Sequence, residues 1–370
     1  MPDTSTLIDT KPAKTGAITP EGWLTDSWYL AALSEDLKPG KQFRKMLLNQ
    51  PIVLGRTKDG KAFALRDICA HRIVPLSTGR QVDTDGVTTI QCPYHGWRFD
   101  TEGVCRHIPS LTEDTPYKPE RIKVRRYPLY ELNGMVFIFI ADSPRFDGEP
   151  DVPKPDFGPL PDKPNFVIRE EFDCRFDDAL YGLIDPGHVA YVHNQWWWRP
   201  ASAGKKIKKK SFVPMERGWQ IEKHSPSSNS KLYRWVFGDE VQTEICFQLP
   251  CFRWEKISND KATFLTLTCM TPKTEFETHV TQVTYWTGAP IISVFKPLGK
   301  MMGRKFLGQD KTVTTSQTMN SGHHSGMILM DDVDTQSKWY LKAKKEWAMS
   351  RAEGREFVNP VKPTQLIWRS

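Results

Sequence analysis

The first part of the chain alternates apolar and polar positions in short runs, and a period of two is typical of half-buried strands. Turn residues separate these runs. Lys58-Asp59-Gly60 stands between the first two, and Asn133-Gly134, a strong type I′ hairpin signal, stands between the last two. The pattern predicts an N-terminal arm of residues 1–22 and a small all-β domain over residues 23–142. Its strands are expected at 52–56, 62–66, 87–91, 97–99, 104–108, 127–131 and 135–140.

Residues 143–164 hold seven prolines and therefore cannot form a helix or a central strand. We interpret this segment as a linker to a second domain over residues 165–370. In that domain the pattern predicts one helical stretch near 177–193 and another at 335–352, with Asp334 as its N-cap. An antiparallel sheet is expected from strands at 220–223, 232–237, 243–248, 252–257, 263–269 and 279–286. The predicted fold class is α+β.

The length of 370 residues allows two domains with cores of their own, and 39% hydrophobic and 26% charged residues are ordinary for an enzyme. The N-terminus lacks the basic start and apolar run of a signal peptide, and no apolar run is long enough to cross a bilayer. Seven cysteines, an odd number, favour a reducing compartment. We therefore expect a cytoplasmic protein.

The net charge is +7, and part of it lies in the run Lys205-Lys206-Ile207-Lys208-Lys209-Lys210. This run is either a solvated loop face or a docking patch for an acidic electron-transfer protein or another anionic surface. No aromatic-interleaved basic motif and no helix-turn-helix pattern accompanies it, so nucleic acid is not an expected partner.

The most specific chemistry lies in two peptides, Cys69-Ala70-His71-Arg72 and Cys92-Pro93-Tyr94-His95-Gly96-Trp97. A structural zinc usually pairs like ligands with like, and a disulfide between the two cysteines would leave both histidines unexplained. Two matched pairs fit a [2Fe–2S] cluster with two cysteines on one iron and two histidines on the other. Neutral imidazoles raise the reduction potential, which makes a Rieske centre. The expected cluster ligands are Cys69, His71, Cys92 and His95.

The segment Asp185-Pro186-Gly187-His188-Val189-Ala190-Tyr191-Val192-His193 predicts a second metal site. Two histidines and one carboxylate form the facial triad of non-haem Fe(II) oxygenases. Positions five apart on a straight helix point about 140° away from each other. If both histidines bind one metal, we therefore expect an over- or underwound helix there, for example a π-bulge.

The third ligand must come from elsewhere in the chain, and Asp310 is our candidate. Asp331, Asp332 and Asp334 are alternatives, but they stand where the last helix needs capping carboxylates. Two adjacent histidines, His323 and His324, are expected on a loop or at a pocket rim. The other histidines show no partner pattern: His107, His224 and His279.

With these motifs the chain resembles the oxygenase (α) components of Rieske non-haem iron oxygenases, and among them the α-only type. The likeness runs from about Trp23 to the C-terminus and rests on C-A-H-R, C-P-Y-H-G-W, D-P-G-H-V-A-Y-V-H and the late Gln309-Asp310. It implies an N-terminal Rieske domain and a C-terminal helix-grip domain whose antiparallel sheet wraps the iron. It also implies that Fe(II) is held by His188, His193 and Asp310.

The resemblance implies a head-to-tail homotrimer in which Asp185 bridges His95 of one subunit and His188 of its neighbour. Members of the family often carry an amide side chain three residues before this aspartate, where the present chain has Gly182. A hydrogen bond near the iron is then missing, or it is supplied by Tyr181 or water.

The implied activity is that of an oxygenase that takes electrons from a separate reductase or ferredoxin. The chain has no flavin or nicotinamide fingerprint, so NAD(P)H acts only through that partner. We expect O₂ and a bulky hydrophobic substrate, steroid- or sterol-like or polycyclic, to be hydroxylated or demethylated. Trp196-Trp197-Trp198 is expected either to line the pocket or to pack in the core or the trimer interface.

Two alternatives stay open. One is a ring-hydroxylating dioxygenase that acts on an aromatic compound, and the other is a Rieske electron carrier without oxygenase activity. Iron content separates an oxygenase of either kind from the carrier, because an oxygenase needs about three irons per chain, the carrier two, and a zinc protein none.

Overall fold

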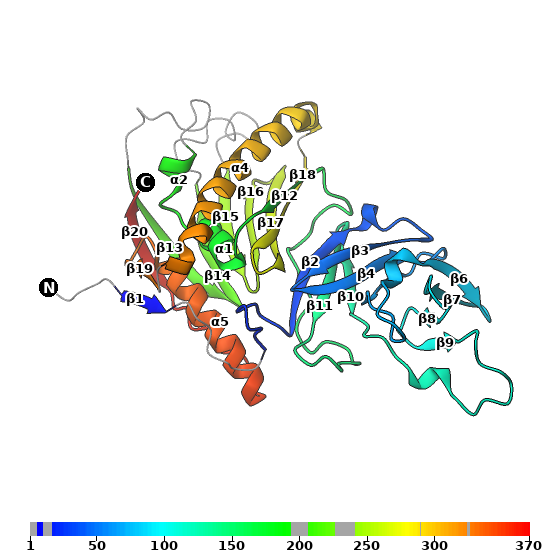
Figure 1. The fold of residues 1–370 in the computed structure, drawn as a ribbon. Helices are drawn as coiled ribbons and strands as arrows, with labels where there is room; N and C mark the ends of the chain where they lie inside the picture. Colours follow the sequence, from blue (N-terminus) through cyan, green and yellow to red (C-terminus); the bar gives the residue numbers. More distant parts are fainter. Residues whose placement is uncertain (1–5, 10–16, 194–205, 226–240, 289, 324–325) are drawn as a thin grey trace. The chain divides into compact units, whose positions relative to one another are not determined.

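The structure, a computed structural model, describes residues 6–9, 17–193, 206–225, 241–288, 290–323 and 326–370 (Figure 1). The chain divides into two compact units. One is Thr25–Asp156, and the other is made of Met1–Leu24 and Phe157–Ser370. The N-terminal segment groups with the C-terminal unit, where β1 (Thr6–Asp9) pairs with β19 (Gly326–Leu329). The fold class is α+β, as the sequence predicts.

The unit Thr25–Asp156 contains three antiparallel sheets among its described residues. The turn predicted at Asn133-Gly134 is confirmed, because both residues have positive φ, 52° and 79°, as a type I′ turn requires. The first sheet is β2 (Ser27–Leu33), β10 (Leu129–Leu132) and β11 (Met135–Ile140); the second is β3 (Lys41–Leu47), β4 (Gln50–Arg56) and β5 (Ala62–Arg66); the third is β6 (Arg80–Thr84), β7 (Val87–Gln91), β8 (Arg98–Asp100) and β9 (Cys105–His107).

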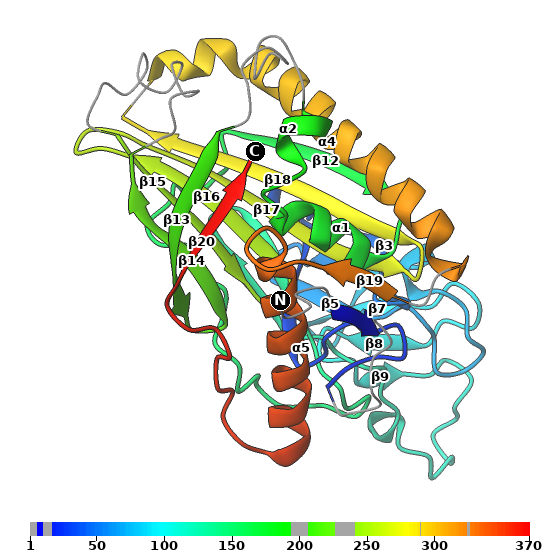
Figure 2. The same cartoon turned by 90° about the vertical axis from the view of Figure 1, so that its left-hand side faces the viewer.

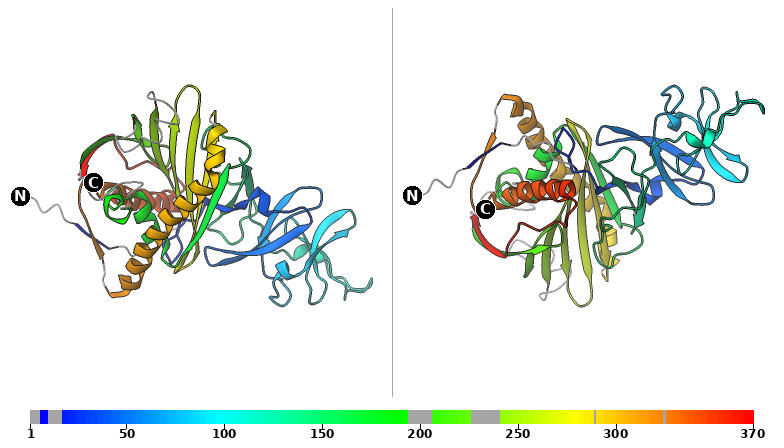
Figure 3. Two further views of the ribbon diagram at one scale, coloured as in Figure 1. Left: turned by 90° about the horizontal axis from the view of Figure 1, so that it is seen from above. Right: turned by 90° about the horizontal axis from the view of Figure 1, so that it is seen from below.

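The other unit is built on an antiparallel sheet in the order β12-β18-β17-β16-β15-β14-β13-β20. The helices lie on one face of this sheet (Figures 2 and 3). The strands are β12 (Phe166–Phe172), β13 (Ile207–Met215), β14 (Gly218–His224), β15 (Gln242–Gln248), β16 (Phe252–Ser258), β17 (Thr263–Thr274), β18 (Glu277–Thr287) and β20 (Thr364–Arg369); the helices are α1 (Phe176–Ile184), α2 (Val189–Val192), α4 (Lys296–Asn320) and α5 (Thr335–Glu353). Five of the six predicted strands are confirmed, and the sixth, 232–237, lies outside the described residues.

The single helical stretch predicted near 177–193 is wrong, because two helices, α1 and α2, occupy it. Asp185 separates them with an extended conformation, φ −74° and ψ 119°. The residue after it is Pro186, whose ring disfavours the helical conformation of the preceding residue. The proline therefore ends α1, and the chain turns before α2 begins. The predicted last helix is confirmed as α5.

The long helix α4 was not predicted from the sequence. Glycines at 299, 303 and 308 lower its intrinsic helix propensity. Tertiary packing explains why the helix forms. A Cβ atom on Gly303 would lie 2.4 Å from Cδ1 of Ile168 in β12, so the missing side chain lets the helix approach the sheet closely. The contact with the sheet outweighs the low propensity.

For the lysine run the sequence left two interpretations open, a solvated loop face or a docking patch, and the loop is wrong for the described part of the run. From Ile207 onward the run is strand β13, paired on one side with β20 and on the other with β14. Lysine-rich runs lack the apolar alternation that reveals a strand, so only the pairing with distant partners shows it. No helix among the described residues is long and apolar enough to cross a membrane.

Candidate metal centres

The four candidate ligands of the first site lie on two loops of the unit Thr25–Asp156. Cys69 follows β5 and Cys92 follows β7, and both thiols are buried in the core that the last two sheets share. The partner histidines, His71 and His95, are exposed at the loop tips, with their ring centroids 4.6 Å apart. The structure therefore brings all four predicted ligands together, with sulfur on the inside and imidazole on the outside.

Each loop is closed by backbone hydrogen bonds that fix its cysteine. The N–H of Cys69 donates to the carbonyl of Val74 at 2.9 Å, and the N–H of Cys92 donates to that of Trp97 at 2.8 Å. Trp97 also stacks on the ring of His71, with centroids 4.6 Å apart and planes 7° apart. Gly96 has a φ of +72°, and a Cβ atom there would lie 2.9 Å from Pro109, so the second loop requires glycine at this position.

The donor set fits an iron–sulfur cluster. Burial raises the pKa of the Cys69 thiol to about 11, although the backbone N–H groups of His71 and Arg72 point to its sulfur. Such a thiol stays protonated at neutral pH unless a bound cation replaces its proton. Both cysteines are free thiols. Two buried thiols beside two exposed imidazoles match a cluster whose cysteine iron is enclosed and whose histidine iron lies near the surface.

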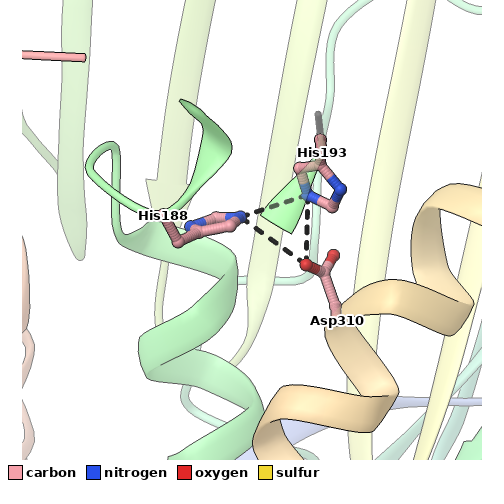
Figure 4. A group of neighbouring side chains, drawn as sticks. All are labelled: His188, His193 and Asp310. Carbon is pink, nitrogen blue, oxygen red and sulfur yellow. Dashed lines mark hydrogen bonds and ion pairs between the residues drawn. The ribbon is translucent and has the colours of Figure 1, made fainter. Parts of the chain in front are cut away.

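The second candidate site joins three side chains from two helices of the other unit (Figure 4). His188 and His193 flank α2, and Asp310 lies on α4. The Nε2 atoms of the two histidines are 3.2 Å apart, and Oδ1 of Asp310 is 3.1 Å from Nε2 of His193 and 3.6 Å from Nε2 of His188. Ligands in adjacent positions around an ion with bonds of about 2.1 Å lie about 3 Å apart. Three such distances define one face of a coordination sphere and leave the opposite face open.

Neighbouring groups set which ring nitrogens face the ion. Nδ1 of the fully buried His193 lies 3.1 Å from Oε1 of Gln309, so Nδ1 carries the proton and Nε2 presents its lone pair. Nδ1 of His188 is 3.6 Å from Oδ2 of Asp185 and makes no hydrogen bond among the described residues. Burial lowers the pKa of His188, but the carboxylates of Asp185 and Asp310 outweigh this effect and raise the pKa overall.

The expected π-bulge is wrong. The N–H of Val192 donates to the carbonyl of His188 at 2.9 Å, and that of His193 donates to Val189 at 3.3 Å, which is ordinary α-helical hydrogen bonding. The helix is a single turn with the histidines at its two ends. His193 has already left the helical conformation, with φ −100° and ψ 40°. The rings converge from opposite ends of this turn onto a point beside it, so they need not share one helical face.

Two residues that hold the site, Gln309 and Phe306, were not predicted as site residues from the sequence. Gln309 was noted only as part of a motif, and Phe306, whose ring stacks on His193 with centroids 3.4 Å apart, was not considered. Both lie within one turn of Asp310 on α4. A prediction of that helix would have placed them on the same side, because residues three or four apart share a face.

Gly182 lies on α1 opposite α4. A Cβ atom there would be 3.2 Å from Cγ2 of Thr314, so a larger side chain would require that threonine to move. The hydroxyl of Tyr181, the suggested substitute donor, is buried and makes no hydrogen bond with the described residues. Its ring packs edge-on against Tyr340.

The alternative carboxylates lie outside the metal cluster. Asp331 pairs with Lys338 at 2.7 Å, and Asp332 accepts the N–H of Ile367 at 3.1 Å. Asp334 stands at the N-cap of α5, but its carboxylate accepts the N–H of Met330 and makes no side-chain cap bond. His323 is exposed on a 3₁₀ turn after α4. Trp196-Trp197-Trp198 and His324 lie outside the described residues.

A cavity of about 820 Å³ adjoins the second site, and both His188 and Asp310 line it. Its wall is one face of the large sheet. A single row of paired residues crosses the wall: Ile221, Ile245, Glu255, Thr266, Thr284 and Phe166. Apolar side chains from α4 and from the sheet, among them Leu298, Phe306 and Trp286, form part of the remaining lining, together with polar and charged groups. The metal site therefore faces a space large enough for a bulky organic molecule.

Comparison with known proteins supports the assignment of the first site to an iron–sulfur cluster. Residues 27–128 match the family model of the Rieske [2Fe-2S] domain. The chain is 35% identical over 173 residues to the oxygenase component of dicamba O-demethylase from Stenotrophomonas maltophilia, covering 46% of this chain and 48% of that protein. It is 32% identical over 168 residues to a putative toluene-4-sulfonate monooxygenase system iron-sulfur subunit from Comamonas testosteroni, covering 45% and 46%.

A third relative is the oxygenase subunit of 3-chlorobenzoate-3,4-dioxygenase from Comamonas testosteroni, 31% identical over 182 residues, with 49% of this chain and 40% of that protein covered. The chain thus spans about half or less of the length of these curated relatives. A solved structure extends the likeness in fold. The crystal structure of dicamba monooxygenase with non-heme iron and dicamba matches with a TM-score of 0.66 at 22% identity, over 89% of this chain and 98% of that one.

Fold and sites together define a protein that carries a Rieske [2Fe–2S] domain and, on a separate helix-and-sheet unit, a cluster of two histidines and one carboxylate. The resemblance drawn from the sequence agrees with these findings: residues 27–128 match the Rieske [2Fe-2S] domain, and the chain is similar over about half its length to the oxygenase component of dicamba O-demethylase.

Proposed function

We propose that the protein is the oxygenase component of a multicomponent Rieske oxygenase, which hydroxylates or oxidatively demethylates a bulky, largely apolar substrate. The observation that carries this proposal is the position of the second site: His188, His193 and Asp310 form one cluster, and two of its members, His188 and Asp310, line the 820 Å³ cavity. A molecule bound in the cavity lies beside the open face of the triad. The volume and the apolar lining favour a steroid- or sterol-like or polycyclic molecule.

The proposed cluster ligands are Cys69, His71, Cys92 and His95, and the proposed Fe(II) ligands are His188, His193 and Asp310. When bound, the cluster supplies single electrons and the Fe(II) ion supplies open positions for O₂. The work of the chain is to hold and orient these groups. Gln309 fixes the tautomer of His193, and Phe306 covers the ring of His193.

Asp185 is proposed as the link between the two sites. Its carboxylate already accepts the N–H groups of Gly187 at 2.6 Å and His188 at 3.1 Å, which fixes its position. It lies on the Nδ1 side of the His188 ring, so it can hold the proton at that nitrogen. In a head-to-tail homotrimer the same carboxylate would face His95 of a neighbouring subunit.

Electrons are proposed to come from a separate reductase or ferredoxin that uses NAD(P)H. The names of the relatives, an oxygenase component and an iron-sulfur subunit of larger systems, support this requirement. Seven free and buried cysteines support a reducing compartment, and we place the protein in the cytoplasm.

The type of oxygenation stays open between two classes. The dicamba relative is an O-demethylase, which favours demethylation, and the chlorobenzoate relative is a dioxygenase, which favours the ring-hydroxylating alternative. Product mass separates them: loss of a methyl group, gain of one oxygen atom, or gain of two hydroxyl groups.

The test is iron analysis of anaerobically purified protein, followed by NADH-dependent O₂ uptake with a surrogate reductase and a panel of methoxyarenes, sterols and aromatic acids. We expect about three irons per chain and substrate-dependent uptake. An Asp310→Ala variant should retain about two irons and lose this uptake. Two irons in the unchanged protein, with no uptake for any substrate, would show an electron carrier instead.

A further inference from the structure

One wall of the cavity carries lysine side chains. Strand β13 alternates exposed and partly buried positions: Ile207 and Lys209 are exposed, whereas Lys208 and Lys210 are partly buried and line the cavity. Successive side chains of a strand point to opposite faces, so Lys208 and Lys210 lie on the same face of β13. This face borders the cavity that His188 and Asp310 also line. The lysine run is therefore divided between solvent and the cavity.

Among the residues that the structure describes, Lys210 has no counter-charge. Its ammonium group makes no ion pair or hydrogen bond with a described residue, and burial alone lowers its pKa. By contrast, Lys223 on the adjacent strand β14 pairs with Glu244 at 3.2 Å. A partly buried cation without a partner is unfavourable, and an anion bound next to it removes this cost.

The neighbour of Lys210 in the cavity is His224, which does not supply a negative charge. Its Nδ1 lies 2.9 Å from the carbonyl oxygen of Glu222, so that nitrogen donates its proton. Burial and the positive charge of Lys210 lower the pKa of His224, partly offset by this hydrogen bond. At neutral pH a neutral imidazole therefore stands beside the ammonium group.

The acidic groups of the cavity are committed elsewhere or distant. Asp310 belongs to the metal cluster, and Asp185 accepts two backbone N–H groups. Glu255 lies on β16, and strands β14 and β15 separate it from β13, a span of about 14 Å at the usual strand spacing. Against these stand four cationic side chains that line the cavity: Lys208, Lys210, Arg253 and Lys296.

The lysines line the same cavity as two of the proposed metal ligands, His188 and Asp310. Lys208 pairs with Trp368, the residue before the last one of β20. In Figures 1 and 2, which are turned by 90° from each other, this end of β20 lies beside α2 and thus beside the histidines. A group held by the lysines therefore lies in the cavity that His188 and Asp310 also line.

We propose that Lys210, together with Lys208, forms an anion subsite that binds the carboxylate or sulfonate group of the substrate. The apolar part of the molecule then lies against α4 and the sheet. This inference rests on the proposed function and narrows it: the substrate is a bulky acid, not a neutral sterol.

The test measures binding without turnover, so that it does not depend on the oxygenase activity. Calorimetric titration of iron-loaded protein with 2-naphthoate, naphthalene-2-sulfonate and the neutral 2-naphthamide compares two acids with a matched amide. We expect the protein to bind at least one of the two acids more tightly than it binds the neutral amide. Lys210→Gln and Lys208→Gln should each weaken binding of that acid about tenfold or more, since a hydrogen bond to a charged group contributes about 1.5–3 kcal/mol. Binding of the amide should not change.

Lys209→Gln is the matched control, because this exposed lysine is adjacent in sequence and points to the other face of β13. It should leave binding of the acid within about twofold. Lys210→Arg keeps the charge and should preserve the acid preference, which separates loss of charge from damage to the strand. No preference of the unchanged protein for either acid over the amide would overturn the proposal. Equal losses for Lys209→Gln and Lys210→Gln, or for acid and amide, would do the same.

These outcomes are distinct from failure of the proposed function. A protein that binds the acids through Lys210 but shows no substrate-dependent O₂ uptake would retain the subsite and lose the oxygenase assignment. Uptake with a neutral sterol and no acid preference would retain the oxygenase and refute the subsite.

Discussion

Gln309 provides a test of how the protein prepares His193 for a metal ion. Its Oε1 lies 3.1 Å from Nδ1 of His193, whose ring is 0% exposed, and Nε2 of that ring lies 3.1 Å from Oδ1 of Asp310. With Gln309 present, the proton belongs on Nδ1 and Nε2 is free to bind. In Gln309→Leu, a change similar in size, the metal-free ring instead gains by moving its proton to Nε2 and donating to Asp310.

Metal binding in this variant must reverse that tautomer and leave a buried N–H without an acceptor. An unsatisfied buried donor costs about 1–3 kcal/mol. This corresponds to a loss of Fe(II) affinity of about 5- to 150-fold at 1.4 kcal/mol per factor of ten, in line with the tenfold to hundredfold effects typical of residues that orient metal ligands.

The assay is anaerobic Fe(II) titration against a competing chelator, on protein that keeps its cluster and has an empty mononuclear site. Gln309→Glu retains an acceptor at the same position and should bind within a few-fold of the unchanged protein. Thr312→Ala, at an exposed position of the same helix, controls for general effects on α4. Equal affinities of Gln309→Leu and the unchanged protein, or an equal loss in Thr312→Ala, would refute the reasoning.

Three further predictions follow from other contacts. Asp185→Asn should keep the iron content but abolish coupled turnover, because it removes the charge beside Nδ1 of His188; normal coupling in an O₂-uptake assay would contradict this role. Gly303→Val should destabilise the protein by about 1–3 kcal/mol, since its Cβ would meet Ile168 at 2.4 Å, and Ile168→Ala in the same chain should recover part of the loss in thermal unfolding. Asp177→Ala should cost about 3–5 kcal/mol in denaturant unfolding because it leaves Lys344, 2.6 Å away and largely buried, without its counter-charge; a change below 1 kcal/mol would show that this pair is solvated.

The sequence was sufficient for the parts of the fold that depend on local signals. Hairpins such as the one around Asn133-Gly134 follow from turn chemistry, and α5 follows from its periodicity. The sequence was not sufficient for α4. Its glycines lower the helix propensity, and only the packing of Gly303 against Ile168 of β12 explains why a helix forms there. The broken helix near Asp185 was within reach of the sequence, because Pro186 gives a local reason for the break.

For the metal centres, the ligand types and spacings alone indicated which side chains to bring together, because metal ions select few residue types in few spacings. Only the tertiary structure determined the contacts between residues that lie far apart along the chain. It placed Asp310 against two histidines more than a hundred residues away, Gln309 behind one of them, and Lys210 in the same cavity. A sequence pattern records neighbours along the chain, whereas a site is formed by side chains that only packing brings within a few ångströms of one another.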